Sequence, residues 1–380
     1  MLDTTRRHLT RTSLLFLFLV SYLIVLIIPI WFYTSQYATA KVDIKQSEEF
    51  ESLLQKAHDD RLNNLENYTL PSPNWDGASE INESLMECPD VPPGLVGRIK
   101  LSGNVTPAEV YNGHSLERLR PGGYYSPSDC HAREKLAVIV PYRGRRRQLV
   151  ILLFHLHNIL QRQQRNYAIF VVEMAFPTVF NRGLLANAGY ITARQTGKFS
   201  CIIVHDVDLL PVNDHNIYTC GKHPRHLNVN SSKYGYKLLY SSYVGGVTAL
   251  RAAQYEKING FSNAYFGWGK EDDDLYKRMT KEGYRIERPA HEIGIYEEIR
   301  KSRADFSNPN NPFSDSLLSR ADKRMKQDGV RRVLYRRLTL EYRQLFTWVY
   351  ISTSELDVMK FIYAVDPELK KSYDRLKLPK

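Results

Sequence analysis

Apolar runs typical of buried strands alternate with stretches of helical periodicity through the middle of the chain. Residues 135–143 form a short, β-branched apolar run, and residues 145–163 repeat leucine and isoleucine at helical spacing. A second such pair occupies 167–174 and 181–195, and a third apolar run covers 199–211. This strand–helix order predicts an α/β fold, with a sheet of parallel strands and helices on both faces.

Charged side chains follow the ends of these predicted strands. Arg143 and Arg145 come after the first strand, Arg182 begins the second helix, and Asp206 and Asp208 end the third strand. Ligands of open α/β sheets bind beyond the carboxyl ends of the strands. We therefore expect these side chains to converge on one crevice.

Asp206 and Asp208 are separated by one residue, so on a continuing strand both carboxylates would face the same side. Such a pair is unfavourable unless a cation lies nearby. Hard divalent cations take carboxylate ligands and often share them with phosphate oxygens. The motif predicts a metal–diphosphate site, and a solvated turn is the alternative.

Glu271, Asp272, Asp273 and Asp274 form a run of adjacent carboxylates after an aromatic–glycine segment. Neighbouring anions raise the proton affinity of a carboxylate, which suits a general base. The alternative is an acidic helix start that favours the helix dipole. Both interpretations can hold together.

An uncharged stretch at 14–33 has the length of about twenty residues that a membrane-spanning helix needs. Arg6, Arg7 and Arg11 precede it, which predicts that residues 1–13 form a cytosolic tail and that the rest of the chain lies in the lumen. A cleaved signal peptide is the alternative.

The polar stretch 34–85 is predicted to be a stem, and 86–380 a lumenal catalytic domain. The four cysteines, Cys88, Cys130, Cys201 and Cys220, allow three disulfide pairings, of which Cys201 with Cys220 is a natural local pair. Sequons predict glycosylation at Asn67, Asn82, Asn104 and Asn230.

The composition is globular and basic, with 380 residues, 43% hydrophobic residues and a formal net charge of +11. A basic chain can bind nucleic acid, acidic surfaces or phosphorylated small molecules. The sequence has neither zinc-finger spacing nor an arginine-rich repeat with interleaved aromatics. We therefore expect no nucleic-acid partner.

Several blocks, in order, resemble the β-1,4-galactosyltransferase family of Golgi type II membrane glycosyltransferases. They include "VPYRGRRRQL", "FNRGLLANAGY", "HDVDLLPVNDHNIYTC", "YVGGVTAL" and "INGFSNAYFGWGKEDDDLYKRM". The resemblance implies a GT-A fold with a Rossmann-like mixed sheet. It also implies inverting transfer of galactose from UDP-galactose to the 4-hydroxyl of a terminal N-acetylglucosamine, with Mn²⁺ as cofactor and Mg²⁺ as the alternative ion.

By this resemblance, Asp272 is the general base, Glu271 hydrogen-bonds sugar hydroxyls, and Trp268 covers the sugars. The implied donor-binding residues are Pro141, Tyr142, Arg143, Arg145, Phe180, Arg182, Asp206, Val207, Tyr243, Gly245 and Gly246. The implied acceptor-binding residues are Tyr234, Tyr240, Asp272, Asp273 and Phe313. The implied disulfides are Cys88–Cys130 and Cys201–Cys220.

The implied metal site departs from the family pattern. Asp208 is retained, Glu298 replaces a methionine, and Lys301 stands where the family has a metal-binding histidine. Asp208 and Glu298 could hold the ion with water, Lys301 could neutralise the diphosphate, or turnover could be weak. Lys270 is a second departure, near the acceptor.

Two further features of the resemblance bear on substrates. The segment at about 299–320 matches a loop that closes over the bound donor and implies donor-first binding, with a plain loop as the alternative. Tyr243 matches the tyrosine that galactose users of the family have at this position. Since a tyrosine would crowd a 2-acetamido group, the match favours UDP-galactose. UDP-N-acetylgalactosamine as donor is the first alternative, and a non-catalytic glycan-binding protein is the second.

Overall fold

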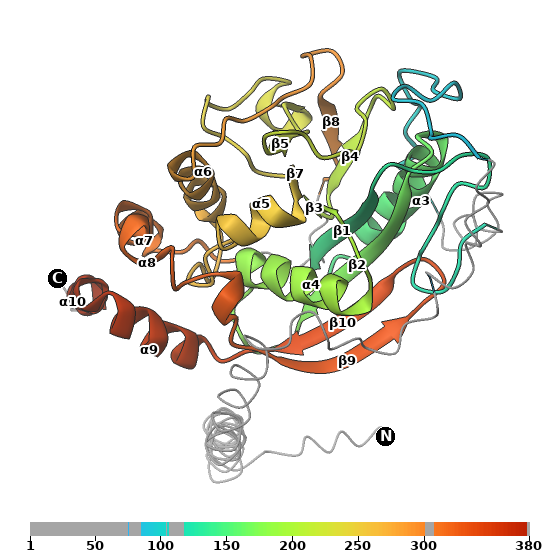
Figure 1. Ribbon diagram of the computed structural model, residues 1–380. Coiled ribbons are helices and arrows are strands. Elements are labelled where there is room, and N and C mark those ends of the chain that lie inside the picture. The colour runs from blue at the N-terminus through green and yellow to red at the C-terminus, as the bar shows by residue number, and fades with distance from the viewer. Residues whose placement is uncertain (1–74, 76–84, 104, 106–117, 301–307, 378–380) are drawn as a thin grey trace, which may run out of the picture. The chain divides into compact units, whose positions relative to one another are not determined.

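The computed structural model describes residues 75, 85–103, 105, 118–300 and 308–377 (Figure 1). The chain divides into two compact units, Met1–Asn63 and Asn64–Lys380, and every described residue lies in the second. Within the described ranges, no helix is long and apolar enough to cross a membrane. Outside them lie the predicted tail and anchor, almost all of the predicted stem, Asn67, Asn82, Asn104 and Lys301.

A seven-stranded mixed sheet has the strand order β5-β7-β3-β1-β2-β10-β9. Strands β3, β1, β2 and β10 run parallel, β7 pairs antiparallel with β3 and β5, and β9 pairs antiparallel with β10. The predicted parallel order is therefore confirmed for the first three strands. The strands are β1 (Lys135–Tyr142), β2 (Asn166–Met174), β3 (Cys201–His205), β5 (Arg225–His226), β7 (Val247–Arg251), β9 (Arg336–Tyr342) and β10 (Thr347–Ser352).

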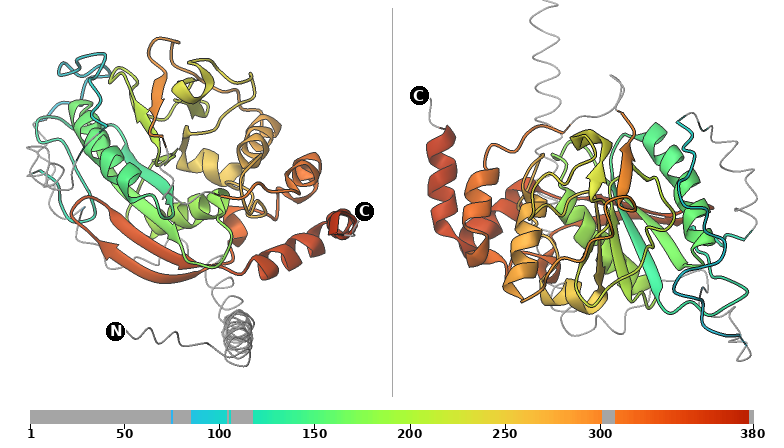
Figure 2. Two further views of the ribbon diagram at one scale, coloured as in Figure 1. Left: turned by 180° about the vertical axis from the view of Figure 1, so that it is seen from behind. Right: turned by 90° about the horizontal axis from the view of Figure 1, so that it is seen from above.

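Helices α3 (Arg146–Arg162) and α4 (Arg182–Thr196) cover opposite faces of this sheet (Figure 2). Alternate side chains of a strand point to opposite faces. Val138 of β1 accordingly packs in the cluster that contains the α3 leucines, and Ile139 packs in the cluster that contains α4. The predicted helices on both faces are confirmed.

A second, three-stranded sheet has the order β4-β8-β6. Its strands are β4 (Leu209–Pro211), β6 (Asn230–Ser231) and β8 (Ile295–Glu298). The other elements are the helices α5 (Ala252–Lys257), α6 (Glu271–Lys281), α7 (Ser314–Ser319), α8 (Ala321–Arg324), α9 (Glu355–Val365) and α10 (Pro367–Lys377), and the 3-10 helices η1 (Ser232–Tyr234) and η2 (Val330–Arg332). In Figure 1 the C-terminal helices α9 and α10 lie beside α7 and α8.

The single strand predicted over 199–211 is wrong. Strand β3 ends at His205, and β4, which starts at Leu209, joins the second sheet. Residues 206–208 connect the two as a turn, with the Leu209 amide 3.4 Å from the Asp206 carbonyl oxygen. The strand alternation that we used to place Asp206 and Asp208 on one side therefore does not apply.

Trp75, which we expected in the stem, is buried in the core of the described unit. Its indole stacks on Tyr124 at 5.4 Å and meets Phe170 and Tyr342 edge-on. The indole nitrogen donates to the carbonyl oxygen of Pro121 over 2.9 Å. The predicted domain boundary at residue 86 therefore excludes a residue that packs against the sheet.

Candidate active site

A cleft of about 660 Å³ lies where β1, β2 and β3 end. The five charged side chains predicted to converge, Arg143, Arg145, Arg182, Asp206 and Asp208, all line it. Other predicted site residues that line it are Pro141, Phe180, Val207, Tyr234, Tyr240, Tyr243, Gly246, Trp268, Glu271, Asp272 and Asp273. The predicted convergence is therefore confirmed, although the two aspartates reach the cleft from a turn.

Of the residues predicted to bind the donor or the acceptor, three do not line the cleft. Tyr142 is buried in the core on the α3 face, and the ring of Phe313 lies 4.3 Å from that of Tyr373 in α10. Gly245 lies behind the cleft wall, where a Cβ would be 2.3 Å from Oδ2 of Asp272. Its missing side chain is therefore what makes room for the carboxylate. Phe313 does not line the cleft in this structure, so its contact with the acceptor stays a prediction.

Sequence reasoning missed part of the lining. Lys233 and Leu239 come from the segment around η1, where no motif marked them. The remaining lining residues flank Trp268 or belong to the predicted lid, namely Gly269, Lys270, Asn308, Asn310, Asn311 and Ser314, and of these Lys270 was expected near the acceptor. The backbone of Trp268 is hydrogen-bonded to Pro309 and Asn311, at 2.8 and 3.0 Å. These bonds bring this part of the predicted lid to the cleft.

Arginines hold the two aspartates of the turn. Nη1 of Arg145 lies 2.7 Å from Oδ2 of Asp208, and Nε of Arg182 lies 2.6 Å from Oδ1 of Asp206. Arg182 also lies 4.0 Å from Glu271 of α6. These pairs join the ends of β1 and β3 to α4 and α6, so the cleft carries mixed charge.

The acidic run divides into two parts where α6 begins. Glu271, Asp272 and Asp273 line the cleft, whereas Asp274 is fully buried behind it. Asp274 accepts from Arg278 over 2.6 Å and from Arg324 over 2.8 Å. Helix dipole and catalytic interpretations therefore both fit, because the first turn is acidic and three of its carboxylates face the cleft.

Asp272 is the carboxylate with the marked pKa change. Burial, and then the charge of Glu271, raise its pKa to about 8, against the opposing effect of Arg182. A carboxylate with this pKa binds a proton more readily than one in water. At neutral pH it is suited to exchange a proton with a sugar hydroxyl.

Aromatic rings surround Asp272 on the side of η1. Tyr243 meets Tyr234 and Tyr240 edge-on, with ring centroids 5.7 and 5.5 Å apart. The hydroxyl of Tyr240 donates to Asp273 over 2.7 Å. Trp268 is 59% exposed at the lip, so its ring is free to cover a ligand.

At the other end of the cleft, Arg143 is nearly buried between two phenylalanines. Its guanidinium lies 4.8 Å from the ring centroid of Phe176 and 5.5 Å from that of Phe180. It also donates to the Thr178 carbonyl oxygen. These contacts fix the guanidinium next to Phe180, whose ring also lines the cleft and can stack on a base. Phe176 was not predicted, because no sequence signal distinguished it from other loop residues.

The carboxylates of Asp208 and Glu298 both line a smaller cavity that shares residues with the cleft. Nζ of Lys233 lies 3.7 Å from Glu298. The carboxylates of Asp208 and Glu298 are hard oxygen donors of the kind that Mg²⁺ and Mn²⁺ accept. In the described part of the chain, the one group of three His, Cys, Asp or Glu ligand atoms within 4.8 Å is Glu134 with Cys201 and Cys220. Those two sulfurs form a disulfide, so that group is no metal site.

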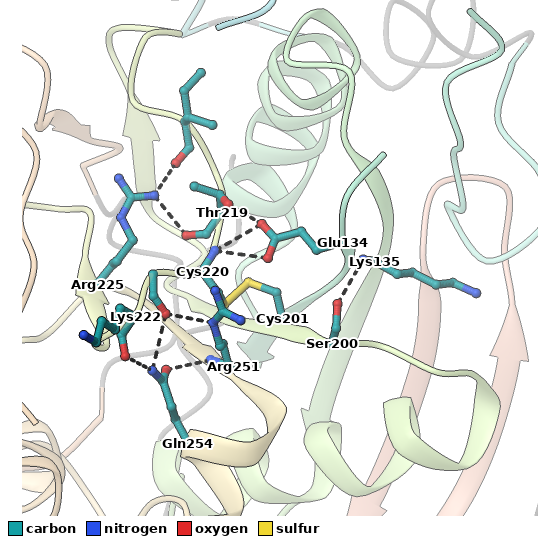
Figure 3. The surroundings of a disulfide bond; sticks show 12 residues. Glu134, Lys135, Ser200, Cys201, Thr219, Cys220, Lys222, Arg225, Arg251 and Gln254 are labelled. Atoms are coloured by element: carbon teal, nitrogen blue, oxygen red, sulfur yellow. Dashed lines mark hydrogen bonds between the residues drawn. A yellow bond between two sulfur atoms is a disulfide. The ribbon is translucent and has the colours of Figure 1, made fainter. Parts of the chain in front are cut away.

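The structure confirms the disulfides Cys88–Cys130 and Cys201–Cys220. The second ties the first residue of β3 to a segment that Glu134 also holds (Figure 3). The Glu134 carboxylate accepts from the backbone amide of Cys220 over 3.1 Å and from the Thr219 hydroxyl. These contacts fix the strand whose other end carries Asp206.

The predicted glycosylation of Asn230 is wrong for the folded chain. The side chain is fully buried in β6 and donates to the carbonyl oxygen of His291 over 2.6 Å. A glycan needs an exposed amide nitrogen. The sequon predicted a surface loop, but β6 pairs with β8 inside the domain.

Comparisons with known proteins agree with this architecture. The model for the N-terminal region of glycosyl transferase group 7 matches residues 88–221, and that for the N-terminal domain of galactosyltransferase matches 225–302. A Drosophila β-1,4-galactosyltransferase 7 variant, solved in complex with manganese, UDP-Gal and xylobiose, superposes with a TM-score of 0.51 and 28% identity. That superposition covers 58% of this chain and 94% of the other.

Sequence relatives are closer. Human β-1,4-galactosyltransferase 3 is 42% identical over 276 residues, which is 72% of this chain and 70% of the relative. Rat β-1,4-galactosyltransferase 4 is 42% identical over 273 residues, which is 71% of this chain and 78% of the relative. The chain therefore belongs to the β-1,4-galactosyltransferase family and is a hexosyltransferase.

Proposed function

We propose that the protein transfers galactose from UDP-galactose to the 4-hydroxyl of a terminal N-acetylglucosamine, with inversion at the anomeric carbon. The observation that carries the proposal is Asp272, a half-buried carboxylate with a pKa of about 8, in a cleft that also offers arginines and aromatic rings. The Drosophila relative, in complex with UDP-Gal and a disaccharide, supports both a nucleotide-sugar donor and a glycan acceptor.

The donor takes the end of the cleft where the strands end. The uracil base lies against Pro141, Arg143 and Phe180, which form its flat walls. Arg145 and Lys233 then meet the diphosphate oxygens, since cations on both sides of the turn line the cleft there.

The acceptor lies between Trp268, Tyr240 and the start of α6. Asp272 takes the proton of the 4-hydroxyl while that oxygen bonds to the anomeric carbon. The bond from the anomeric carbon to the UDP oxygen breaks, and its electron pair leaves with UDP. Trp268 excludes water from the reacting atoms, which limits hydrolysis of the donor.

Asp208 and Glu298 would hold a divalent cation, with Mn²⁺ favoured by the solved relative and Mg²⁺ as the alternative. When bound, such an ion neutralises negative charge on the leaving diphosphate. Arg145 and Lys233, which pair with these carboxylates in the structure, then become available to the phosphate oxygens.

Tyr243 supports galactose as the transferred sugar. Its ring is held by edge contacts with Tyr234, Tyr240 and His226. Nη2 of Arg288 also donates to its backbone carbonyl over 3.0 Å. A ring fixed in this way leaves little space for a 2-acetamido group, so UDP-N-acetylgalactosamine is the less favoured donor.

A transfer assay tests the proposal. The full chain in detergent is offered radiolabelled UDP-galactose or UDP-N-acetylgalactosamine with an N-acetylglucosaminide, in Mn²⁺, Mg²⁺ or EDTA. We expect galactose transfer, a β-1,4 linkage and at least tenfold less transfer from the second donor. If the protein binds UDP-galactose but forms no β-1,4-linked galactose product on the N-acetylglucosaminide, the proposal is overturned.

A further inference from the structure

A small cavity of about 30 Å³ adjoins the cleft beside the Asp206–Asp208 turn. Its lining includes the oxygen-bearing side chains of Asp206, Asp208, Asn228, Ser231 and Glu298, and the cation of Lys233. A buried water needs about 10–15 Å³ of such space, so the cavity has room for a small ion or water.

Asn228 is the unusual member of this lining. Its side chain is only 1% exposed, and among the described residues its Oδ1 has no hydrogen-bond partner. Leaving a buried carbonyl oxygen unpaired is unfavourable, so such atoms in folded proteins usually serve an ion, a water or a function.

Neighbouring glycine backbone makes room for this amide. A Cβ on Gly246 would lie 2.4 Å from Nδ2 of Asn228, so any other residue there would displace the side chain. Gly246 also has a φ of +85°, a backbone conformation that favours glycine. The Gly246 carbonyl oxygen accepts from the Asp206 amide over 2.9 Å, which ties the same glycine to the carboxylate turn.

The cation site needs a further protein ligand. The two carboxylates Asp208 and Glu298 are the implied donors, and Lys301 stands where the family has a histidine. No third His, Cys, Asp or Glu ligand atom joins them within 4.8 Å in the part of the chain that the structure describes. An amide oxygen is an accepted ligand for hard divalent cations and would not appear in such a search.

We propose that Oδ1 of Asn228 is a protein ligand of the divalent cation, beside Asp208 and Glu298, and replaces the histidine that this chain lacks. The inference rests on the proposed function, because it concerns the cation of the same site. All three protein donors are then oxygens. Such a set favours hard ions and discriminates weakly between Mg²⁺ and Mn²⁺, unlike one that contains imidazole.

Direct cation binding tests the proposal without reference to transfer. Mn²⁺ is titrated into the full chain in detergent with UDP present, and free Mn²⁺ is followed by electron paramagnetic resonance. Asn228→Ala is compared with Asn230→Ala, which removes another buried amide with an unpaired Oδ1 that does not line the cavity. We expect the Mn²⁺ Kd to rise about tenfold or more in Asn228→Ala and less than twofold in Asn230→Ala.

Asn228→Asp keeps an oxygen at the position and adds a charge, so we expect it to bind Mn²⁺ at least as tightly as the parent. The Mg²⁺ concentration that displaces half of the bound Mn²⁺ from the parent should lie within about tenfold of the Mn²⁺ concentration. An unchanged Kd in Asn228→Ala, or equal losses in both alanine variants, would overturn the proposal. If the parent transfers galactose but Asn228→Ala binds Mn²⁺ normally, only this inference fails. If Asn228→Ala loses Mn²⁺ but the parent transfers no galactose, the proposed function fails and the cation site stands.

Discussion

At Asp272 two effects act in the same direction. Burial disfavours the charged carboxylate, and the adjacent Glu271 charge repels it, so the pKa rises to about 8 although Arg182 opposes the change. A base must be deprotonated to accept the acceptor proton. Below about pH 8, the fraction of Asp272 in the reactive form therefore falls about tenfold per pH unit.

The pH profile of kcat/KM, which reports groups of the free enzyme, measures this directly. We expect an acid limb with a slope of one below about pH 8 and a plateau above it. Glu271→Gln removes the second cause of the raised pKa, so its acid limb should move to lower pH. A limb that keeps its position in Glu271→Gln would contradict this account of the pKa.

Tyr243 is a second single residue with a predicted role, the selection of the donor sugar. Tyr243→Leu removes a ring that three neighbouring rings hold in place, and the space that it frees can take an acetamido group. We expect the ratio of kcat/KM for UDP-N-acetylgalactosamine to that for UDP-galactose to rise at least tenfold. Tyr276→Leu, an aromatic change on α6 outside the cleft, is the control and should leave the ratio unchanged.

At the scale of elements, a buried charge network sets the position of α6. Asp274 and Arg278 of α6 are joined to Arg324 of α8 and to Asp328, and all four side chains are fully buried. The charges of the two arginines and the two aspartates cancel. Backbone carbonyl oxygens accept the remaining guanidinium hydrogens, as in the bond from Arg324 to the carbonyl oxygen of Leu317. The network lies directly behind the three carboxylates that face the cleft.

Arg324→Met leaves the negative charge of Asp274 and Asp328 only partly compensated in the core. Breaking such a buried pair costs about 3–5 kcal/mol, so the denaturant midpoint should fall markedly. Lys323→Met changes the exposed neighbour on the same helix and should alter the free energy of unfolding by less than about 0.5 kcal/mol. Equal midpoints for the two variants would mean that the network contributes little.

The sequence predicted the early elements because their signals are local. The β-branched run of β1 and the leucine spacing of α3 carry their own periodicity, and the structure matches both within a residue or two. The features that the sequence did not predict depend on contacts with residues that are distant in the chain. Strand β4 leaves the main sheet because it pairs with β8, and Phe313 packs on Tyr373 of a helix that no pattern placed there.

For the whole molecule, the site depends on long-range convergence. Arg145 after β1, Asp206 after β3 and Asp272 on α6 meet in one cleft although they are far apart in sequence. The rule that ligands bind at the carboxyl ends of parallel strands predicted that Arg145 and Asp206 would meet there, but it did not predict that Asp272 would join them. Family resemblance, not pattern, supplied Tyr243 and the role of Asp272, and neither source identified Asn228.

We also propose that the chain is a single-pass Golgi membrane protein with its catalytic domain in the lumen, from its uncharged stretch at 14–33 and the preceding arginines. Two disulfides in the described unit are consistent with an oxidising compartment. In sealed vesicles, a tag after Lys380 should resist added protease until detergent is present, whereas a tag before Met1 should be digested at once. The reverse pattern would refute this orientation.

The central claim is that the acidic start of α6 deprotonates an acceptor beside a bound UDP-sugar. The most direct test compares galactose transfer and UDP binding in Asp272→Asn, with Asp322→Asn on the exposed face of α8 as the matched control. We predict a loss of transfer of at least about a thousandfold in Asp272→Asn, a UDP Kd within about threefold of the parent, and parental behaviour in the control. Transfer by Asp272→Asn within tenfold of the parent would contradict the account.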